Sequence, residues 1–88
     1  MIFEFDPEKS LANQLKHGID FSEGQLLWEN ICIELDSPFL GELRKLVIGK
    51  INDNFWTAII THRNDKVRII SIRRSRTNEK NLYEKFLE

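Results

Sequence analysis

Hydrophobic and polar residues alternate over much of the second half of the chain, and this period of two predicts a run of β-strands. Asn52-Asp53-Asn54 and Asn64-Asp65 interrupt the alternation as turns, and the second of these predicts a hairpin. A short alternating segment near the N-terminus predicts a further strand. The strands are expected over residues 2–5, 31–36, 43–51, 55–63 and 66–76.

A helix is predicted between the first of these strands and Gly18. Asp6 is a suitable N-cap because its carboxylate accepts from free amides, and Pro7 suits the first helical position because it has no amide hydrogen to donate. Gly18 is expected to end the helix after His17 in the left-handed conformation. The residues expected to form its buried stripe are Leu11, Ala12 and Leu15.

Two further helices are predicted, one after Ser22 and one at the end of the chain. Ser22 with Gln25 fits a capping box, and Ser75 or Thr77 is expected to cap the last helix, which reaches Glu88. The residues expected to face the core from the earlier helix are Leu26, Leu27 and Trp28. The helically spaced hydrophobic residues of the last one are Leu82, Tyr83, Phe86 and Leu87.

The order of these elements predicts the fold class. One strand, two helices, four strands and a helix favour an α+β domain on a mostly antiparallel sheet, with two N-terminal helices and a C-terminal helix. The 88 residues suffice for one modest hydrophobic core, so residues 1–88 are expected to form a single domain.

The strand at 66–76 is rich in β-branched residues and ends in several cations. Val67 and Ile69 are expected on one face, with Ile70 and Ile72 on the other, which is typical of a central strand or one that shifts register at a bulge. A two-residue turn at Asn64-Asp65 predicts that Trp56 pairs with Arg73. The cations at the end of the strand are Arg73, Arg74 and Arg76, of which the first two are expected to point to opposite faces.

Charge divides unevenly along the chain, although its net value is −1. Residues 1–43 hold two Lys or Arg against nine Asp or Glu, whereas residues 44–88 hold eleven against five. This asymmetry predicts one acidic and one basic surface, and the basic one is suited to RNA, DNA or an acidic protein.

Composition excludes several classes of protein. No apolar run approaches the roughly 20 residues that cross a bilayer, so we expect a cytoplasmic protein without a membrane partner. The single Cys32 predicts a buried hydrophobic side chain rather than a nucleophile. Two distant histidines, scattered carboxylates and four isolated glycines match neither a metal-ligand set nor a phosphate loop. We therefore expect no metal and no cofactor.

The remaining inventory of imidazole, guanidinium, ammonium and carboxylate groups suits metal-free RNA cleavage. The 2′-hydroxyl attacks its own phosphate, so the enzyme supplies a proton acceptor, a proton donor and cations for the phosphate oxygens. The candidates are His17, Glu42, Arg44, His62, Arg63, Arg73 and Arg74. Each also has an ordinary explanation, such as a helix cap for His17, a surface ion pair for Glu42 with Arg44, or a solvated turn for Arg63.

Several segments together resemble the BrnT family, small bacterial toxins of type II toxin-antitoxin systems. The resemblance covers essentially the whole chain and is most specific from Asn13 to Phe21 and from Arg68 to Tyr83. The residues that carry it are Phe3-Glu4-Phe5-Asp6-Pro7, Lys9, Asn13, Lys16-His17-Gly18, Phe21, Glu42-Leu43-Arg44, Gly49, Thr61-His62-Arg63, Arg68-Ile69-Ile70-Ser71-Ile72-Arg73-Arg74, Glu79 and Tyr83.

The resemblance implies a RelE-like fold and an endoribonuclease that cleaves RNA without the ribosome and inhibits translation. It implies a BrnA-like ribbon-helix-helix antitoxin as partner, which neutralises the toxin and through which alone the pair contacts operator DNA. The implied catalytic residues are His17, Glu42, Arg44, Arg63 and Arg73, with His17 or Glu42 as the base. Lys16 is the implied phosphate contact, and His62 and Arg74 are further candidates for RNA binding.

This chain departs from the family pattern at three positions. Phe5 replaces a usual Trp, Ile60 a frequent Tyr, and Ile72 a small residue, so a hydroxyl is missing at 60 and packing beside Arg73 is altered. A weakened or differently tuned toxin is therefore one alternative. A second is a non-catalytic binding module with a basic face, and a third is a folded protein whose site has decayed.

Overall fold

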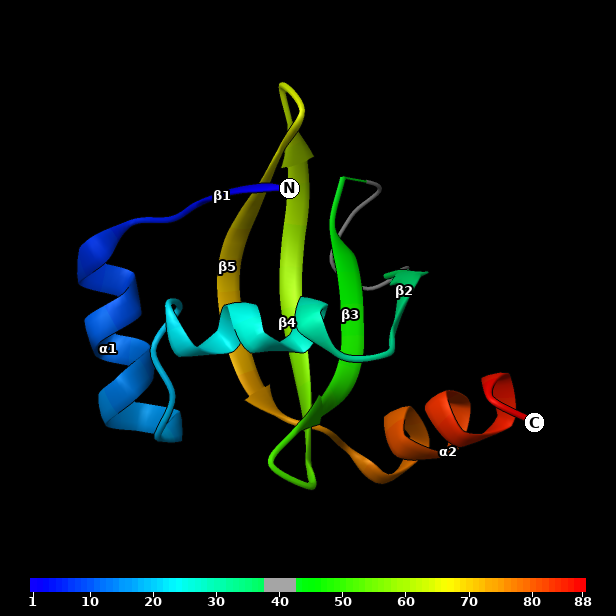
Figure 1. Ribbon diagram of the computed structural model, residues 1–88. Helices are drawn as coiled ribbons and strands as arrows, with labels where there is room; N and C mark the ends of the chain where they lie inside the picture. Colours follow the sequence, from blue (N-terminus) through cyan, green and yellow to red (C-terminus); the bar gives the residue numbers. More distant parts are fainter. Residues whose placement is uncertain (38–42) are drawn as a thin grey trace.

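The computed structural model describes residues 1–37 and 43–88 and contains one five-stranded sheet (Figure 1). The strands lie in the order β1-β5-β4-β3-β2, so the first strand of the chain is beside the last. Their bounds are β1 (Ile2–Glu4), β2 (Cys32–Asp36), β3 (Lys45–Ile51), β4 (Asn54–Arg63) and β5 (Lys66–Arg74). The helices are α1 (Pro7–His17), the 3-10 helix η1 (Glu23–Glu29) and α2 (Thr77–Phe86).

The structure has the predicted α+β class, but the predicted architecture is wrong. The sheet is mixed rather than mostly antiparallel, because β1 pairs in parallel with β5, with Ile2 opposite Lys66. The predicted pair of N-terminal helices is a single α-helix followed by the 3-10 helix η1. The order of strands along a chain does not reveal which of them pair, and the short β1 gave no signal for a partner more than sixty residues away.

The segment around η1 begins differently from the prediction. Ser22 makes no side-chain capping bond, and Oδ1 of Asp20 instead accepts from the Glu23 amide at 2.7 Å. Leu27 is buried as expected, whereas Leu26 is partly exposed. A side chain at Gly24 would collide with Ile72, so this glycine lets η1 lie close against the sheet.

The ends of α1 and the hairpin turns confirm local predictions. Asp6 accepts from the Glu8 amide at 2.9 Å, and Gly18 ends the helix at φ 81°. Asn64 and Asp65 have φ of 51° and 66°, the left-handed conformation that two-residue hairpin turns require. Asn52 and Asp53 have the same conformation between β3 and β4.

The buried side of α1 is polar, so the predicted apolar stripe is wrong. Leu11 is 63% and Leu15 82% exposed, and the buried residues of the helix are Ser10 and Asn13. The reason is that α1 lies along the edge of β5, which β1 covers only as far as Arg68. Backbone groups at that edge need hydrogen-bond partners, which leucine cannot supply.

Asn13 and Ser10 supply these partners. The Asn13 amide donates to the Ile72 carbonyl at 2.8 Å, and its Oδ1 accepts from the Ile72 amide at 3.1 Å, as a neighbouring strand would. Asn13 also donates to the carbonyl of Ile19 at 2.8 Å. Oγ of Ser10 accepts from the Phe21 amide at 2.8 Å. These bonds tie α1 and the segment after it to β5.

A bulge in β5 changes which of its residues share a face. Ile60 lies opposite Ile69 while Ile59 lies opposite Ser71, so Ile70 is an extra residue. The bulge confirms one of the two predicted explanations for this strand, but it places Ile72 on the same face as Val67 and Ile69, contrary to the predicted faces.

The same bulge moves the partners of the arginines by one residue. Trp56 lies opposite Arg74, and Thr57 lies opposite Arg73, so the predicted pairing of Trp56 with Arg73 is wrong. The Arg74 guanidinium lies over the Trp56 ring, 5.4 Å from its centroid. The extra residue could not be foreseen from the length of the turn.

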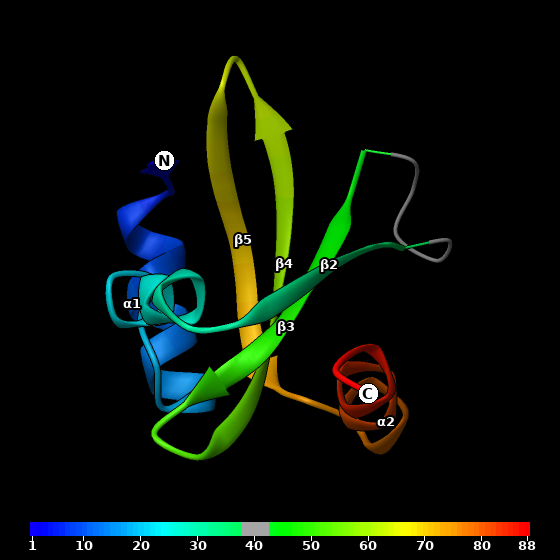
Figure 2. The ribbon, with the colours of Figure 1, turned by 45° about the vertical axis from the view of Figure 1, so that its right-hand side comes forward.

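Hydrophobic residues pack on both faces of the sheet. On the first face, η1 and the segment after α1 cover a large cluster, whereas on the second face α2 covers a smaller one (Figures 1 and 2). The first cluster consists of Ile19, Phe21, Leu27, Val47, Ile51, Ala58, Ile60, Val67, Ile69 and Ile72. The second consists of Ile33, Ile48 and Tyr83, with Leu35 and Phe55 packed against it.

Tyr83 is the buried hydrophobic residue of the last helix. Tyr83 is buried, and its hydroxyl donates to the Ile31 carbonyl at 2.9 Å, whereas Leu82, Phe86 and Leu87 are 46%, 69% and 48% exposed. Neither Ser75 nor Thr77 is the N-cap, because Arg76 holds that position. Across residues 1–37 and 43–88, no helix is long and apolar enough to cross a membrane.

Candidate functional site

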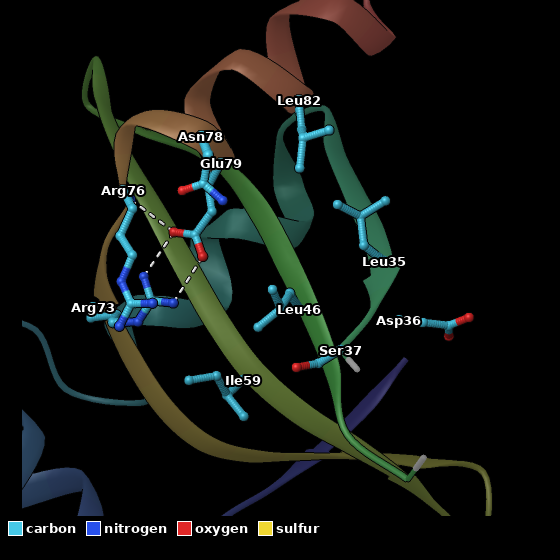
Figure 3. Close-up of a pocket in the computed structure, with 10 residues that line it drawn as sticks. All are labelled: Leu35, Asp36, Ser37, Leu46, Ile59, Arg73, Arg76, Asn78, Glu79 and Leu82. Carbon is cyan, nitrogen blue, oxygen red and sulfur yellow. Dashed lines mark hydrogen bonds and ion pairs between the residues drawn. The ribbon is translucent and has the colours of Figure 1, made fainter. Parts of the chain in front are cut away.

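A pocket of about 350 Å³ lies on the second face, where α2 meets the sheet (Figure 3). Leucine and isoleucine side chains from β2, β3 and β4 form one part of it, and polar side chains from β5 and the start of α2 form the other. Its lining residues are Leu35, Asp36, Ser37, Leu46, Ile59, Arg73, Arg76, Asn78, Glu79 and Leu82.

Arg73 and Glu79 form a two-pronged ion pair at the pocket. Nη1 of Arg73 donates to Oε1 of Glu79 and Nη2 donates to Oε2, both at 2.8 Å. The Glu79 residue is only 4% exposed, and the Arg73 side chain is 18% exposed. Fork geometry of this kind fixes the plane of a guanidinium group as well as its position.

Further hydrogen bonds hold the carboxylate. Oε1 of Glu79 accepts from the Arg76 amide at 2.8 Å and from the Thr57 hydroxyl at 3.0 Å (Figure 3 draws the first). The hydroxyls of Thr57 and Ser75 lie 2.7 Å apart. Glu79 occupies the third position of α2, where a carboxylate commonly bonds the N-cap amide. The strand, the connecting turn and the helix therefore meet at one carboxylate.

These contacts determine the protonation state of the pair. Burial raises the pKa of the Glu79 carboxyl, but hydrogen bonds from Arg73, the Arg76 amide and Thr57, with the charge of Arg73, lower its pKa to about 2. The hydrogen bond to Glu79 also raises the pKa of Arg73 above its ordinary value. Both groups are consequently charged at neutral pH.

More cations follow the same face of the sheet away from the pocket. By register, Arg68 lies opposite Thr61 and Lys66 opposite Arg63, on the face that Arg73 shares with Thr57. Glu4 of β1 lies 3.6 Å from Arg68. We call Arg63, Lys66, Arg68 and Arg73 the basic stripe, and it runs from the β4–β5 hairpin to the pocket.

Among the predicted catalytic residues, Arg73 lines the pocket and Arg63 lies at the far end of the basic stripe. Arg44 is half-buried just before β3, and its carbonyl accepts from the amide of Ser37, a pocket residue, at 3.4 Å. Glu42 lies outside the described residues. These placements bring Arg44 near the pocket, but Arg63 lies six positions along β4 from Thr57, the residue opposite Arg73.

The other predicted residues lie elsewhere. His17 and Lys16 end α1, which runs beside β5 and in its direction, so they lie level with the end of that strand (Figures 1 and 2). His17 is half-buried on the helical side that carries Ser10 and Asn13, and it does not line the pocket. Arg74 lies on the first face over Trp56.

His62 is paired on the first face as well. Its Nε2 lies 2.9 Å from Oε2 of Glu34, and both side chains are largely exposed. The predicted residues that the structure describes therefore lie in four places: at the pocket, along the hairpin end of the sheet, at the end of α1, and, for Arg74, over Trp56 on the first face. The structure does not bring them together around a single point.

The polar residues at and behind the pocket include several that were not among the predicted site residues. Glu79, Thr57 and Ser75 form its buried network, and Arg76 and Asn78 line it. Glu79 lies three residues after Arg76, a spacing that signals the start of a helix. This spacing alone does not indicate that Glu79 belongs to a functional site. Among the described residues, no three His, Cys, Asp or Glu side chains are grouped closely enough to hold a metal ion.

Comparison with family models decides what kind of protein has this site. The model of the ribonuclease toxin, BrnT, of type II toxin-antitoxin systems matches residues 5–79, which is most of the chain. This chain belongs to the BrnT family. Family membership implies a ribonuclease toxin with RNA as its target and a protein antitoxin as its partner. A search of curated proteins gives no match.

The BrnT match spans all of the residues that line the pocket except Leu82. It begins just before α1 and ends at Glu79, so Arg73 and the network around it lie within the matched range. Most of α2 lies beyond it, including the exposed Phe86, and so does the C-cap residue Leu87.

Proposed function

We propose that this BrnT-family chain is an endoribonuclease toxin that cleaves cytoplasmic RNA without a metal ion and thereby inhibits translation. Its antitoxin would be a BrnA-like ribbon-helix-helix protein, through which the pair reaches operator DNA. The observation that supports this most is Arg73, held in a fixed plane at a pocket that ends the basic stripe.

The chemistry follows from RNA itself. The 2′-hydroxyl attacks the adjacent phosphorus, so the bond to the 5′-oxygen breaks and that oxygen takes a proton. In this scheme Arg73 binds the non-bridging oxygens, with Arg44 and Arg63 as further cations. His17 or Glu42 removes the 2′-proton, and Lys16 contacts a flanking phosphate. His62 and Arg74, which lie on the first face, contact phosphates farther along the RNA.

The size and lining of the pocket favour single-stranded RNA. Its volume of about 350 Å³ is near the lower end for small-ligand pockets, which suits one nucleotide rather than a duplex. The apolar side chains of Leu46 and Ile59 offer a surface for a ribose or base, beside the cation that binds the phosphate.

A degradation assay in EDTA tests the proposal. The purified chain is incubated with single-stranded RNA, with and without the candidate antitoxin, beside an Arg73→Ala/His17→Ala double variant. We expect cleavage by the unaltered chain, its loss with antitoxin, and a decrease of at least about 100-fold in the double variant. Lys85→Ala is the control, because Lys85 is an exposed cation in the last turn of α2. Intact RNA, or equal cleavage by the double variant, contradicts the proposal.

The separation of the predicted residues favours a second candidate, a binding module that contacts nucleic acid through the basic stripe without cleaving it. Binding by such a module falls steeply with salt, because phosphate contacts release counterions. RNA that is bound but remains intact, with affinity lost in an Arg63→Ala/Arg68→Ala variant, would favour this function over the nuclease.

A further inference from the structure

We infer that Glu79 is a positioning residue for RNA cleavage: it holds one edge of the Arg73 guanidinium so that the other edge faces the pocket and binds the scissile phosphate. This inference rests on the proposed nuclease function and names the residue that orients its main cation.

The hydrogen bonds to Arg73 divide its donors into two sets. A guanidinium group has five N–H donors in one plane. The pair with Glu79 takes one N–H from Nη1 and one from Nη2, and Nη1 also donates to the Arg74 carbonyl at 3.3 Å. The Nε–H and the second N–H of Nη2 remain, and these two lie side by side on one edge.

The remaining edge has no hydrogen-bond partner in the part of the chain that the structure describes. The bonds of Arg73 there use only Nη1 and one N–H of Nη2. Arg73 lines the pocket, and its side chain is 18% exposed. Two parallel N–H groups match two oxygens of a phosphate.

Glu79 is suited to orientation rather than to attraction. Its negative charge lowers the net charge next to the pocket, so it weakens the long-range pull of Arg73 on RNA. What it contributes is a fixed plane, because its own oxygens are held by the Arg76 amide and Thr57 within a buried site. A group held in advance loses less freedom when the transition state forms.

A positioning role predicts a large effect of Glu79 on the chemical step and little or no loss of binding. Glu79→Gln removes the charge and one acceptor, so Arg73 stays near the pocket but its plane is no longer fixed. We expect kcat to fall by about 10- to 100-fold, since small misplacements of a catalytic group have effects of this size. The Kd for a non-cleavable 2′-deoxy oligonucleotide should change less than about threefold or become tighter.

Glu84→Gln is the matched control, because Glu84 is an exposed carboxylate on the same helix. Its kcat and Kd should equal those of the unaltered chain. Thr57→Val is a second test, since it removes one hydrogen bond from Glu79 but leaves the ion pair, and a several-fold fall in kcat is expected. If circular dichroism shows that Glu79→Gln is unfolded, kcat and Kd are measured on Glu79→Asp and Thr57→Val instead.

The outcomes separate this inference from the function on which it rests. An unaltered chain that leaves RNA intact overturns the proposed function, and this inference with it. An active unaltered chain with a folded Glu79→Gln variant of equal kcat overturns only the positioning role. A variant that loses binding and retains its rate also counts against positioning.

Discussion

Each α-helix is joined to β5 by one buried polar side chain, and the two side chains solve different problems. Asn13 of α1 is 7% exposed and binds backbone groups of Ile72 and Ile19, so it replaces a missing neighbouring strand. Glu79 of α2 is 4% exposed and binds the charged side chain of Arg73. Of these two attachments of helices to β5, only that of α2, beside the pocket, depends on charge.

Removing Asn13 should have the largest effect on stability. Asn13→Ala leaves the Ile72 amide and carbonyl and the Ile19 carbonyl without their partner, and each unsatisfied group costs about 1–3 kcal/mol. We expect the free energy of unfolding to fall by about 3 kcal/mol at every pH where the protein folds. Urea unfolding measures it, with the exposed neighbour Gln14→Ala as control. A loss below about 1 kcal/mol would contradict the strand-replacing role.

Removing the charge of Glu79 should cost about 2 kcal/mol near neutral pH, since it breaks a charge-assisted pair. The folded pKa of about 2 is below the unfolded value of about 4.3, so the stabilisation is complete above pH 4.3 and is lost as pH falls through 2. We therefore expect the difference between the unaltered chain and Glu79→Gln to shrink between pH 4.5 and pH 2. Urea unfolding over this range checks it, and a difference that stays constant with pH disproves the linkage.

The hydroxyl of Tyr83 is a smaller attachment of α2, and it is neutral. Tyr83→Phe removes its bond to the Ile31 carbonyl, for which we expect a loss of about 1 kcal/mol that does not vary between pH 3 and pH 7. The same titrations measure it. A pH-dependent loss would mean that Tyr83 acts through the Glu79 network rather than independently of it.

The exposed leucines of α1 should have the smallest effect. Leu11→Ser and Leu15→Ser are expected to change the free energy of unfolding by less than about 0.5 kcal/mol, because neither side chain is buried. Leu27→Ala is the contrasting variant, with an expected loss of 2 kcal/mol or more for a fully buried leucine. A large loss at Leu15 would show that α1 has an apolar attachment after all.

Local signals in the sequence predicted the ends of α1 and the turn between β4 and β5, but not the caps of η1 and α2. Asp6 and Gly18 set the ends of α1, and Asn64-Asp65 set the turn between β4 and β5, because these side chains act on backbone within a few residues. The α+β class also followed from the pattern. Pairing of β1 with β5 did not, because it joins segments that are distant in the chain.

The candidate site was only partly predictable for the same reason. Arg73 could be named because cations cluster at the end of its strand, and it does line the pocket. Glu79 could not, because its role depends on where α2 packs, and a Glu at the third position of a helix is common. Asn13 was likewise missed, because the need of the β5 edge for a polar partner is visible only in three dimensions.

Ile70 is an extra residue in β5, and it determines which face of the sheet the later side chains of this strand occupy. Every side chain after it faces the side opposite to the one that strict alternation from Asn64-Asp65 would give, which is why Arg73 faces the pocket and Arg74 faces Trp56. Deletion of Ile70 would remove the bulge and leave Ile72 and both arginines on their present faces, because Ile69 and Ser71 already lie opposite the consecutive residues Ile60 and Ile59. The bulge, rather than strict alternation along the strand, therefore determines which of the two arginines lines the pocket.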